Sequence, residues 1–142
     1  MDATGCTVEI ATPDMGTGLA FARAGERLAA AHLLTGHGLA LVATNLRVSV
    51  EGLRGELDVV VTDGRTGLLV VCEVKSRTAA TGAGAAETLS PRQQQRIRRM
   101  TGLLLANRTL VARGVRFDLV TVDRPARGTG ASVTLRHLAG AW

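Results

Sequence analysis

The run Leu68–Cys72, followed by Glu73-Val74-Lys75, constrains the fold of this chain more than any other feature of its sequence. Successive side chains of a β-strand point to opposite faces of the sheet, so a strand that is apolar at every position must be covered on both faces. We therefore expect this strand in the middle of a sheet that has packed layers on either side.

Two segments with helical periodicity are available to cover such a sheet. Apolar residues recur at helical spacing from about Gly18 to Thr35, and Gly36 and Gly38 supply the stop. Ser90-Pro91 has the cap and first-turn residues of a second helix that runs to about Asn107. The predicted buried stripes are Leu19, Ala22, Ala29, Ala30 and Leu33 in the first helix and Ile97, Met100 and Leu104 in the second.

Strand-like runs fill the rest of the chain. We predict a strand over Leu39–Val50 with a bulge at Thr44-Asn45, a loop over Glu51–Gly55, and then a hairpin. The hairpin joins Leu57–Thr62 to Leu68–Lys75 through Asp63–Gly67. Thr78–Ala86 and Arg124–Gly130 are predicted loops, and the last strands are Val115–Val122 and Val133–Leu138. This order predicts an α/β fold with a mixed central sheet flanked by helices, in which the second helix is a crossover.

The length of 142 residues, with 46% hydrophobic residues, fits one domain. Residues 1–16 show no clear period, so we predict a disordered tail there and a single domain over residues 17–142. The tail lacks a charged-then-apolar leader, and the apolar runs are too short to cross a membrane. We expect a cytoplasmic protein without a membrane partner, whose two cysteines form no disulfide.

Charge is distributed unevenly along the chain. Residues 91–142 contain ten arginines, no lysine and two acidic residues. Such a basic half suggests a phosphate-rich partner, although a solvated basic surface explains it equally well. Arg92, Arg96 and Arg99 lie along one side of the second helix, where phosphate or water must satisfy them. With only three aromatic residues, the chain is poorly suited to stacking successive bases, so we expect contacts to a nucleic-acid backbone.

Asp58, Glu73 and Lys75 are the residues most suited to chemistry. If Gly64–Gly67 is a four-residue loop, Asp63 pairs with Leu68 and Asp58 lies opposite Glu73. Lys75 then shares the face of Glu73. Glu26 is the third acid, because its place on the apolar stripe of the first helix turns it towards the sheet.

Close carboxylates repel each other unless a proton or a cation lies between them, and hard oxygen ligands favour Mg²⁺, with Mn²⁺ as a substitute. Zinc fits the sequence poorly. His32 and His37 are five residues apart and so lie on different helical faces, His137 is distant, and the cysteines are widely separated. Lys75 is the only lysine beside sixteen arginines, which suggests that a compact, titratable ammonium is needed there. An ordinary Glu–Lys contact is the alternative.

Several motifs of this sequence occur in the order and approximate spacing of the YraN family, which the chain therefore resembles. They are Gly25-Glu26, Asn45-Leu46-Arg47, Gly55-Glu56-Leu57-Asp58, Glu73-Val74-Lys75-Ser76-Arg77 and Arg116-Phe117-Asp118. That family looks like a branch of the PD-(D/E)xK nuclease superfamily, similar in its motifs to archaeal Holliday-junction resolvases.

The resemblance implies a restriction-endonuclease-like αβββαβ core and Mg²⁺-dependent hydrolysis of phosphodiester bonds. It implies that Asp58, Glu73 and the carbonyl of Val74 bind metal, that Glu26 acts through the metal or its water, and that Lys75 is the catalytic lysine. Arg77 would contact phosphate. This sequence departs from the family pattern at Gln93, where relatives often carry lysine, at the missing aromatic-glycine pair after the Glu-x-Lys strand, and in a longer loop before Gly55.

The resulting hypothesis is an endonuclease acting on double-stranded or branched DNA, for which a homodimer is compatible by analogy. The alternatives are a non-catalytic nucleic-acid-binding protein of the same fold that acts within a complex, and a plain α/β interaction domain. Some further candidates each have a structural alternative. Gln93 can bind phosphate at the helix N-terminus or face water. Asn45, Arg47 and Glu56 can line the site or serve only the local structure. For Asp118 we predict an ion pair with Arg116 or a neighbour such as Arg77, with a substrate contact as the alternative.

Overall fold

The computed structural model describes residues 4–11, 14–79, 89–125 and 132–142, and their strands form one mixed sheet. The strand order is β1-β6-β5-β4-β3-β2, in which β4 and β5 are parallel and all other neighbours are antiparallel. The strands are β1 (Thr4–Ala11), β2 (Ala40–Val50), β3 (Leu53–Asp63), β4 (Leu68–Ala79), β5 (Gly114–Pro125) and β6 (Ser132–Ala139). The helical segments are α1 (Gly18–Ala31), the π-helical turn η1 (His32–Gly36) and α2 (Pro91–Ala106). The predicted α/β class with a mixed sheet is confirmed.

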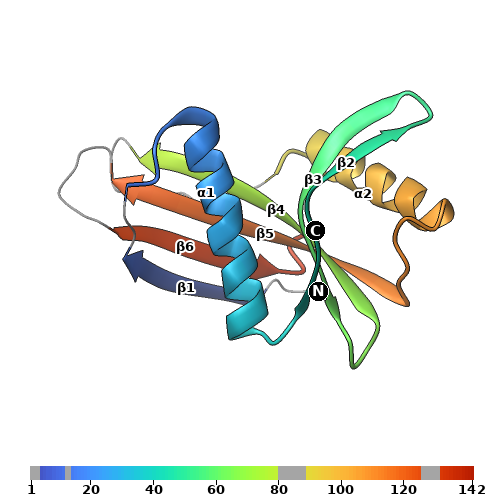
Figure 1. Ribbon diagram of the computed structural model, residues 1–142, viewed down its shortest axis with the longest axis horizontal. Helices are drawn as coiled ribbons and strands as arrows, with labels where there is room; N and C mark the ends of the chain where they lie inside the picture. The colour runs from blue at the N-terminus through green and yellow to red at the C-terminus, as the bar shows by residue number, and fades with distance from the viewer. Residues whose placement is uncertain (1–3, 12–13, 80–88, 126–131) are drawn as a thin grey trace.

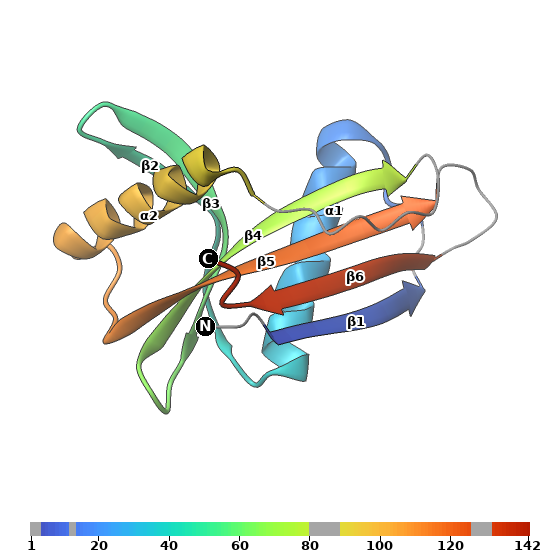
Figure 2. The same ribbon diagram turned by 180° about the vertical axis from the view of Figure 1, so that it is seen from behind.

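Strand β4 lies inside the sheet, with α1 and α2 on opposite faces (Figure 1, Figure 2). Val70 and Cys72 belong to the core that includes Ala29 of α1, whereas Val71 belongs to the core that includes Met100 of α2. This alternation explains why the strand is apolar at successive positions. Helix α2 connects the parallel strands β4 and β5, as the predicted crossover requires.

Helix α1 is rotated in its first turns relative to the predicted stripe. Leu19 is 70% exposed, and Phe21 and Ala24 are buried instead, while Ala29 and Ala30 are buried as expected. In α2, the predicted stripe is buried, Ser90 caps the helix through its hydroxyl, and Pro91 occupies the first turn. Gln93 completes a capping box with Ser90, so its side chain serves the helix end.

A π-helical turn follows α1 and corrects one expectation about the histidines. A π-turn pairs residue i with residue i+5, and it therefore brings side chains five apart to the same side. In the turn His32–Gly36 the rings of His32 and His37 meet edge to face, with centroids 4.9 Å apart. The argument that five-residue spacing separates them holds only for a regular α-helix.

The prediction of a disordered tail over residues 1–16 is wrong for residues 4–11. These residues form β1, which pairs with β6 over its whole length, from Thr4 opposite Ala139 to Ala11 opposite Ser132. The signal in the sequence was a short alternation in which Val8 and Ile10 are separated by polar Glu9. Pairing with β6 stabilises a strand that has too few apolar residues to be recognised alone.

The β2–β3 connection is tighter than the predicted loop over 51–55. Val50 pairs with Leu53, which leaves Glu51 and Gly52 as a two-residue turn with φ of 51° and 77°. Positive φ at both positions is typical of a type I′ hairpin turn. The register of β2 shifts between Leu41 and Ala43, a few residues before the predicted bulge, while Asn45 takes a left-handed φ of 49°.

Two other predicted loops fall largely outside the described residues. Strand β4 continues to Ala79 and β5 to Pro125, so both strands are longer than predicted. The remainder of the predicted loops Thr78–Ala86 and Arg124–Gly130 is not described. Among the described helices, none combines the length and apolar character needed to span a bilayer.

Candidate active site

The candidate site lies where β3 separates from β4. The hairpin has the predicted register, with Asp63 paired to Leu68, and its ladder ends at the pair Val59–Cys72. Continuing this register by one residue places Asp58 opposite Glu73. Beyond the ladder, the Val74 backbone N–H is donated to Asp58 Oδ2 at 2.9 Å. The Asp58 side chain therefore accepts a hydrogen bond from the part of β4 that no longer pairs with the backbone of β3.

The carboxylates of Asp58 and Glu73 repel each other in a largely buried environment. Burial, and then the charge of Asp58, raise the pKa of Glu73 to about 8. Burial also raises the pKa of Asp58, and the charge of Glu26 raises it further, whereas the hydrogen bond from the Val74 N–H lowers it. The pair thus holds a proton near neutral pH or requires a nearby cation.

Lys75 supplies one positive charge on the face of Glu73. Its Nζ lies 3.8 Å from Glu73 Oε1, and the Lys75 side chain is 29% exposed. Val74, between them, belongs to the core on the α1 side, so alternation places Glu73 and Lys75 towards the other face of β4. One ammonium cannot neutralise several carboxylates, which leaves the site with surplus negative charge.

Glu26 reaches the site because α1 packs unusually close to β4. A Cβ on Gly25 would stand 1.9 Å from Ser76 Oγ, so only glycine allows this approach. The next residue, Glu26, is 8% exposed, and its charge acts on both Asp58 and Glu73. Glu26 and Lys75 therefore both act electrostatically on Asp58 and Glu73, Glu26 from the α1 side of β4 and Lys75 from the other face, so the four side chains that the sequence selected influence one centre.

A polar network fixes Glu26 in this position. Arg23 Nη1 donates to Glu26 Oε2 at 3.1 Å and to Glu56 Oε1 at 3.0 Å, and Asn45 donates its side-chain amide to Glu26. The hydrogen bond from Arg23 lowers the pKa of Glu56. The sequence analysis includes Asn45 and Glu56 as candidates but not Arg23, although the spacing of three residues between Arg23 and Glu26 on a helix favours a contact between them.

The donor set fits a hard divalent cation. Carboxylate oxygens are available from Asp58, Glu73 and Glu26, and the N–H and C=O of one strand residue point to the same edge, which turns the Val74 carbonyl towards Asp58. A dication between these oxygens would relieve the repulsion that adds to burial in raising both pKa values. Oxygen ligands of this kind suit Mg²⁺ better than metals that prefer thiolate ligands.

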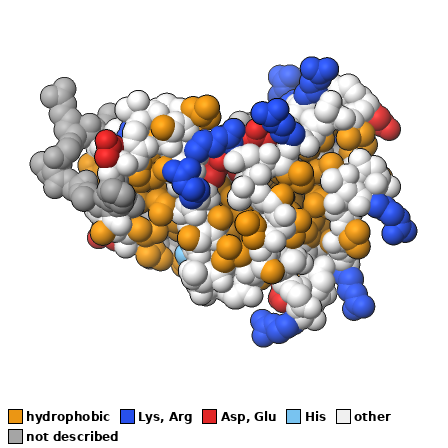
Figure 3. Space-filling view, in the orientation of Figure 1, with side chains coloured by type: hydrophobic (Ala, Val, Ile, Leu, Met, Phe, Trp, Pro, Cys, Tyr) orange, Lys and Arg blue, Asp and Glu red, His pale blue; other side chains and the backbone are white. Residues whose placement is uncertain are grey.

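The predicted phosphate-binding residues are dispersed around this centre. Arg77 Nε donates to Asp123 Oδ1 at 2.6 Å, and Gln93 caps α2. Arg96 donates to the backbone carbonyl of Arg54 in the β2–β3 hairpin, while Arg92 and Arg99 are exposed on α2. Figure 3 shows acidic side chains at the surface between α1 and the β2–β3 hairpin, with basic side chains on both sides of them.

Asp118 forms the predicted ion pair with Arg116. Arg116 Nε and Nη2 donate to its two oxygens at 2.8 and 2.9 Å, and His137 Nε2 lies 2.7 Å from Oδ2. Burial alone would raise the pKa of Asp118, but hydrogen bonds from His137, Arg116 and the Gly140 N–H lower it. Asp118 is therefore a buried structural carboxylate.

Comparison with known proteins identifies the family. The model of the family described as uncharacterised protein family UPF0102 matches residues 25–122, a range that contains Glu26, Asp58, Glu73 and Lys75. A UPF0102 protein of Frankia alni is 41% identical over 123 residues, covering 87% of this chain and 94% of the relative. UPF0102 proteins of Mycolicibacterium gilvum and Mycobacterium tuberculosis are 40% and 36% identical over 116 residues each. These matches cover 82% of this chain and 88% and 87% of those relatives. The sequence-based resemblance is thus confirmed, and the chain belongs to the UPF0102 family, which is the YraN family.

Proposed function

We propose that the protein is a Mg²⁺-dependent endonuclease that hydrolyses phosphodiester bonds in double-stranded or branched DNA. The observation that carries this proposal is the meeting of Asp58 and Glu73 at the end of the β3–β4 ladder, with Glu26 and Lys75 beside them. In this interpretation α1, the three strands β2 to β4, α2 and β5 form a restriction-endonuclease-like core, and the protein acts in the cytoplasm.

The electrostatics of the centre support a metal-dependent reaction. Lys75 and Arg23, which Glu26 shares with Glu56, do not balance the carboxylates of Glu26, Glu56, Asp58 and Glu73, so a dication gains several oxygen ligands and removes a repulsion at the same time. Asp58 and Glu73 would hold the ion, with the Val74 carbonyl as a further ligand and Glu26 acting directly or through a water. Bound Mg²⁺ would polarise the phosphate and lower the pKa of a water molecule.

The chain's own residues then have distinct tasks. The Lys75 ammonium, partly exposed, can hold a water oxygen by hydrogen bonding and stabilise the negative charge that develops on the phosphate. The attacking water loses a proton as its oxygen bonds to phosphorus, one phosphorus–oxygen ester bond breaks, and the leaving oxygen takes up a proton, so the number of protons is unchanged overall. Arg23 and Asn45 act as positioning residues, because both donate hydrogen bonds to the Glu26 carboxylate and so fix its position.

Basic side chains outside the centre support a nucleic-acid substrate. The chain carries a formal net charge of +5, and Arg92 and Arg99 project from α2 into solvent. Contacts from arginine to phosphate oxygens position a duplex without reading its sequence, which fits recognition by shape. A second copy of the chain would supply a second set of such contacts on a branched substrate.

The test is incubation of the purified chain with branched, nicked and linear DNAs in Mg²⁺, in Mn²⁺ and in a chelator. We expect cleavage only with metal, and its loss in Lys75→Ala and Asp58→Asn while DNA affinity is retained. Arg65→Ala and Asp63→Asn are matched controls, because they remove a cation and a carboxylate from the opposite end of the same hairpin.

The outcomes separate the proposals. Cleavage that survives both Lys75→Ala and Asp58→Asn would remove the proposed mechanism. Salt-sensitive binding without cleavage under any metal condition would favour the non-catalytic nucleic-acid-binding protein. Absence of both activities would leave the plain α/β interaction domain.

A further inference from the structure

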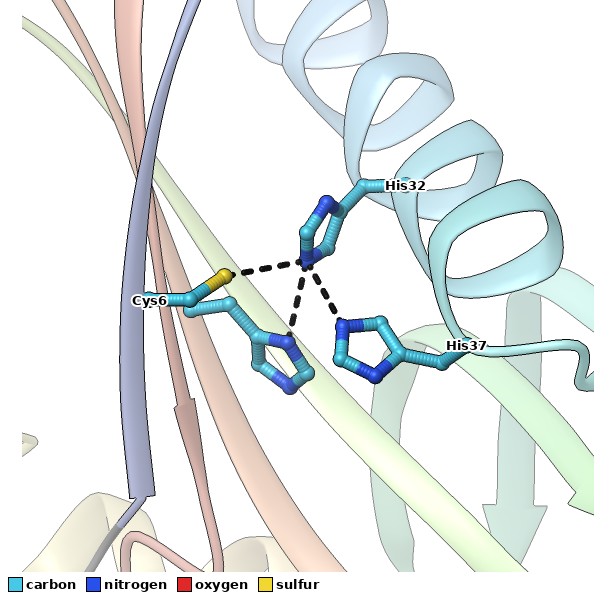
Figure 4. A group of neighbouring side chains, drawn as sticks. Cys6, His32 and His37 are labelled. Carbon is cyan, nitrogen blue, oxygen red and sulfur yellow. Dashed lines mark hydrogen bonds between the residues drawn. The ribbon is translucent and has the colours of Figure 1, made fainter.

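Four side chains with metal-binding atoms converge outside the acidic centre. They come from β1, from the end of α1 with η1, and from β6: Cys6, His32, His37 and His137. One ligand atom from each lies within 4.8 Å of the others. Figure 4 shows Cys6 on its strand directed towards His32, with His37 turned to the same point from the other side.

Hydrogen bonding alone does not account for this cluster. Nε2 of His32 lies 3.1 Å from Nδ1 of His137, 3.2 Å from Nε2 of His37 and 3.6 Å from Sγ of Cys6. A neutral imidazole nitrogen either donates one proton or accepts through one lone pair, so it can satisfy only one of these neighbours well. Three partners around one nitrogen are instead the arrangement expected when lone pairs share a cation.

The distances fit the edges of a metal tetrahedron. Zinc–nitrogen bonds of about 2.0–2.1 Å and a zinc–sulfur bond of about 2.3 Å give tetrahedral edges of about 3.3 Å between nitrogens and about 3.6 Å between sulfur and nitrogen. The three contacts of His32 Nε2 match these lengths closely. Small rotations of the other side chains would complete the polyhedron.

A second layer orients His137 for metal binding. Its Nε2 lies 2.7 Å from Asp118 Oδ2, which places the proton on Nε2 and leaves the lone pair of Nδ1 facing the cluster. Asp118 is itself held by Arg116 and by the Gly140 N–H. A carboxylate behind a histidine is the usual support of a protein metal ligand.

We propose that Cys6, His32, His37 and His137 form a structural zinc site. Four protein ligands close the coordination sphere, so the site stabilises the fold and leaves no position for a substrate. One thiolate with three imidazoles suits Zn²⁺, whereas the oxygen ligands of the acidic centre suit Mg²⁺. The ion would fasten the edge strand β1, and with it the N-terminal segment, to β6 and to the end of α1.

The experiment measures metal binding by the full chain. After removal of metals with a chelator, Zn²⁺ is titrated in competition with a chromophoric chelator, and Co²⁺ is used as a spectroscopic probe. We expect one Zn²⁺ per chain, a higher melting temperature with Zn²⁺, and a Co²⁺ spectrum with tetrahedral bands and a thiolate charge-transfer band.

Variants identify the ligands. Cys6→Ser should abolish the thiolate band, and His37→Ala, at an exposed position, should remove the rise in melting temperature. Asp118→Asn should weaken Zn²⁺ binding by about 10–100-fold. Glu9→Gln, also exposed on β1, is the matched control and should bind as the parent chain does.

Three results would overturn the proposal: a Zn²⁺ stoichiometry well below one, an octahedral Co²⁺ spectrum without a thiolate band, or unchanged Zn²⁺ affinity in both Cys6→Ser and His37→Ala. The exposed His37 keeps the test decisive even if Asp118→Asn fails to fold. None of these measurements depends on DNA cleavage, so failure here and failure of the proposed nuclease activity are separate outcomes.

Discussion

The carboxylate of Asp58 makes two different contacts. It accepts the Val74 N–H at the free edge of β4, and it faces the Glu73 carboxylate. The first contact favours its ionised form, whereas burial and neighbouring acids disfavour it. A residue in this position makes the centre sensitive to both protons and cations.

This sensitivity predicts a pH dependence of stability in the metal-free protein. Glu73 has a folded pKa of about 8 against a usual value of 4.5, so the folded chain keeps a proton that the unfolded chain has lost. Its stabilising contribution is complete below pH 4.5 and declines as the pH rises towards 8. Below pH 6.5 the lowered pKa values of His32 and His37 act in the opposite direction, so we expect the free energy of unfolding to fall by about 1 kcal/mol per pH unit between pH 6.5 and 8, measured by chemical denaturation.

Asp58→Asn is the control for that measurement. Removing the charge of Asp58 lowers the pKa of Glu73 and should flatten the decline, and saturating Mg²⁺ should flatten it in the parent chain because the cation replaces the proton. A parent profile that stays flat or rises between pH 6.5 and 8 without metal would contradict the inferred proximity of these acids.

Asn45 also combines a backbone role with a side-chain role. Its φ of 49° is left-handed, a region that glycine and asparagine tolerate, and its amide donates to Glu26. Both Asn45→Gly and Asn45→Ala remove the amide, but only alanine retains the backbone strain. We expect Asn45→Ala to be less stable than Asn45→Gly by about 1 kcal/mol in thermal or chemical unfolding.

The same pair of substitutions at Thr44 provides the comparison. Thr44 is exposed on β2 and is not among the non-glycine residues with positive φ, so alanine should be at least as stable as glycine there. If alanine and glycine ranked in the same order of stability at both positions, the left-handed backbone at Asn45 would impose no cost on alanine.

Among the elements, α1 depends on a single close approach to the sheet. Gly25 faces Ser76 of β4, whose hydroxyl is buried and makes no hydrogen bond within the described structure. Helix and strand are thereby close enough for Glu26 to act on Asp58. A similar approach occurs at Gly55, where an added Cβ would stand 2.7 Å from Met100 Sδ of α2.

Gly25→Ala should therefore destabilise the fold despite the higher helix propensity of alanine. The added methyl group has no space before Ser76, and overpacking of this kind costs about 1–3 kcal/mol. In differential scanning calorimetry the melting temperature should fall, and Ser76→Ala in the same chain should restore part of it.

Gly102→Ala is a matched control in the other helix. Among the described residues, no atom outside the adjoining backbone of α2 lies within 4 Å of a Cβ added there, so this substitution should stabilise the protein by about 1 kcal/mol through helix propensity alone. If Gly25→Ala stabilised the chain as Gly102→Ala does, α1 would not be packed against β4 at the distance described.

At the scale of the whole molecule, the charge distribution predicts how DNA binding responds to salt. Phosphate contacts release counterions, so the logarithm of the binding constant falls linearly with the logarithm of salt concentration. We expect substitution of Arg92 and Arg99 together by alanine to reduce that slope by about 2, measured by fluorescence anisotropy with a DNA duplex.

Arg65→Ala is the reference for this prediction, because the side chain is 91% exposed and lies at the hairpin turn far along β3 from Asp58. Its slope should remain close to that of the parent chain. A double variant with the parent slope would show that the α2 arginines face solvent only.

Several features were accessible from sequence because they depend on neighbours along the chain. The apolar run of β4 identified a covered strand, the loop between Asp63 and Leu68 fixed which residues oppose each other, and Ser90-Pro91 marked the start of α2. Glu26 was recognised because a charge on an apolar stripe requires a partner. The strand β1 was missed, since its stability comes from pairing with β6 more than one hundred residues later.

By itself, the sequence determined the alternation of helices and strands, the hairpin register and the four residues of the acidic centre, all of which follow from short periodicities. Tertiary structure alone decided that Asn45 of β2 reaches Glu26 of α1, and that Cys6 and three histidines from distant segments meet. The physical reason is that a π-turn, a strand register and the packing of an edge strand must all be in place before those ligand atoms share one point, and no local pattern encodes their combination.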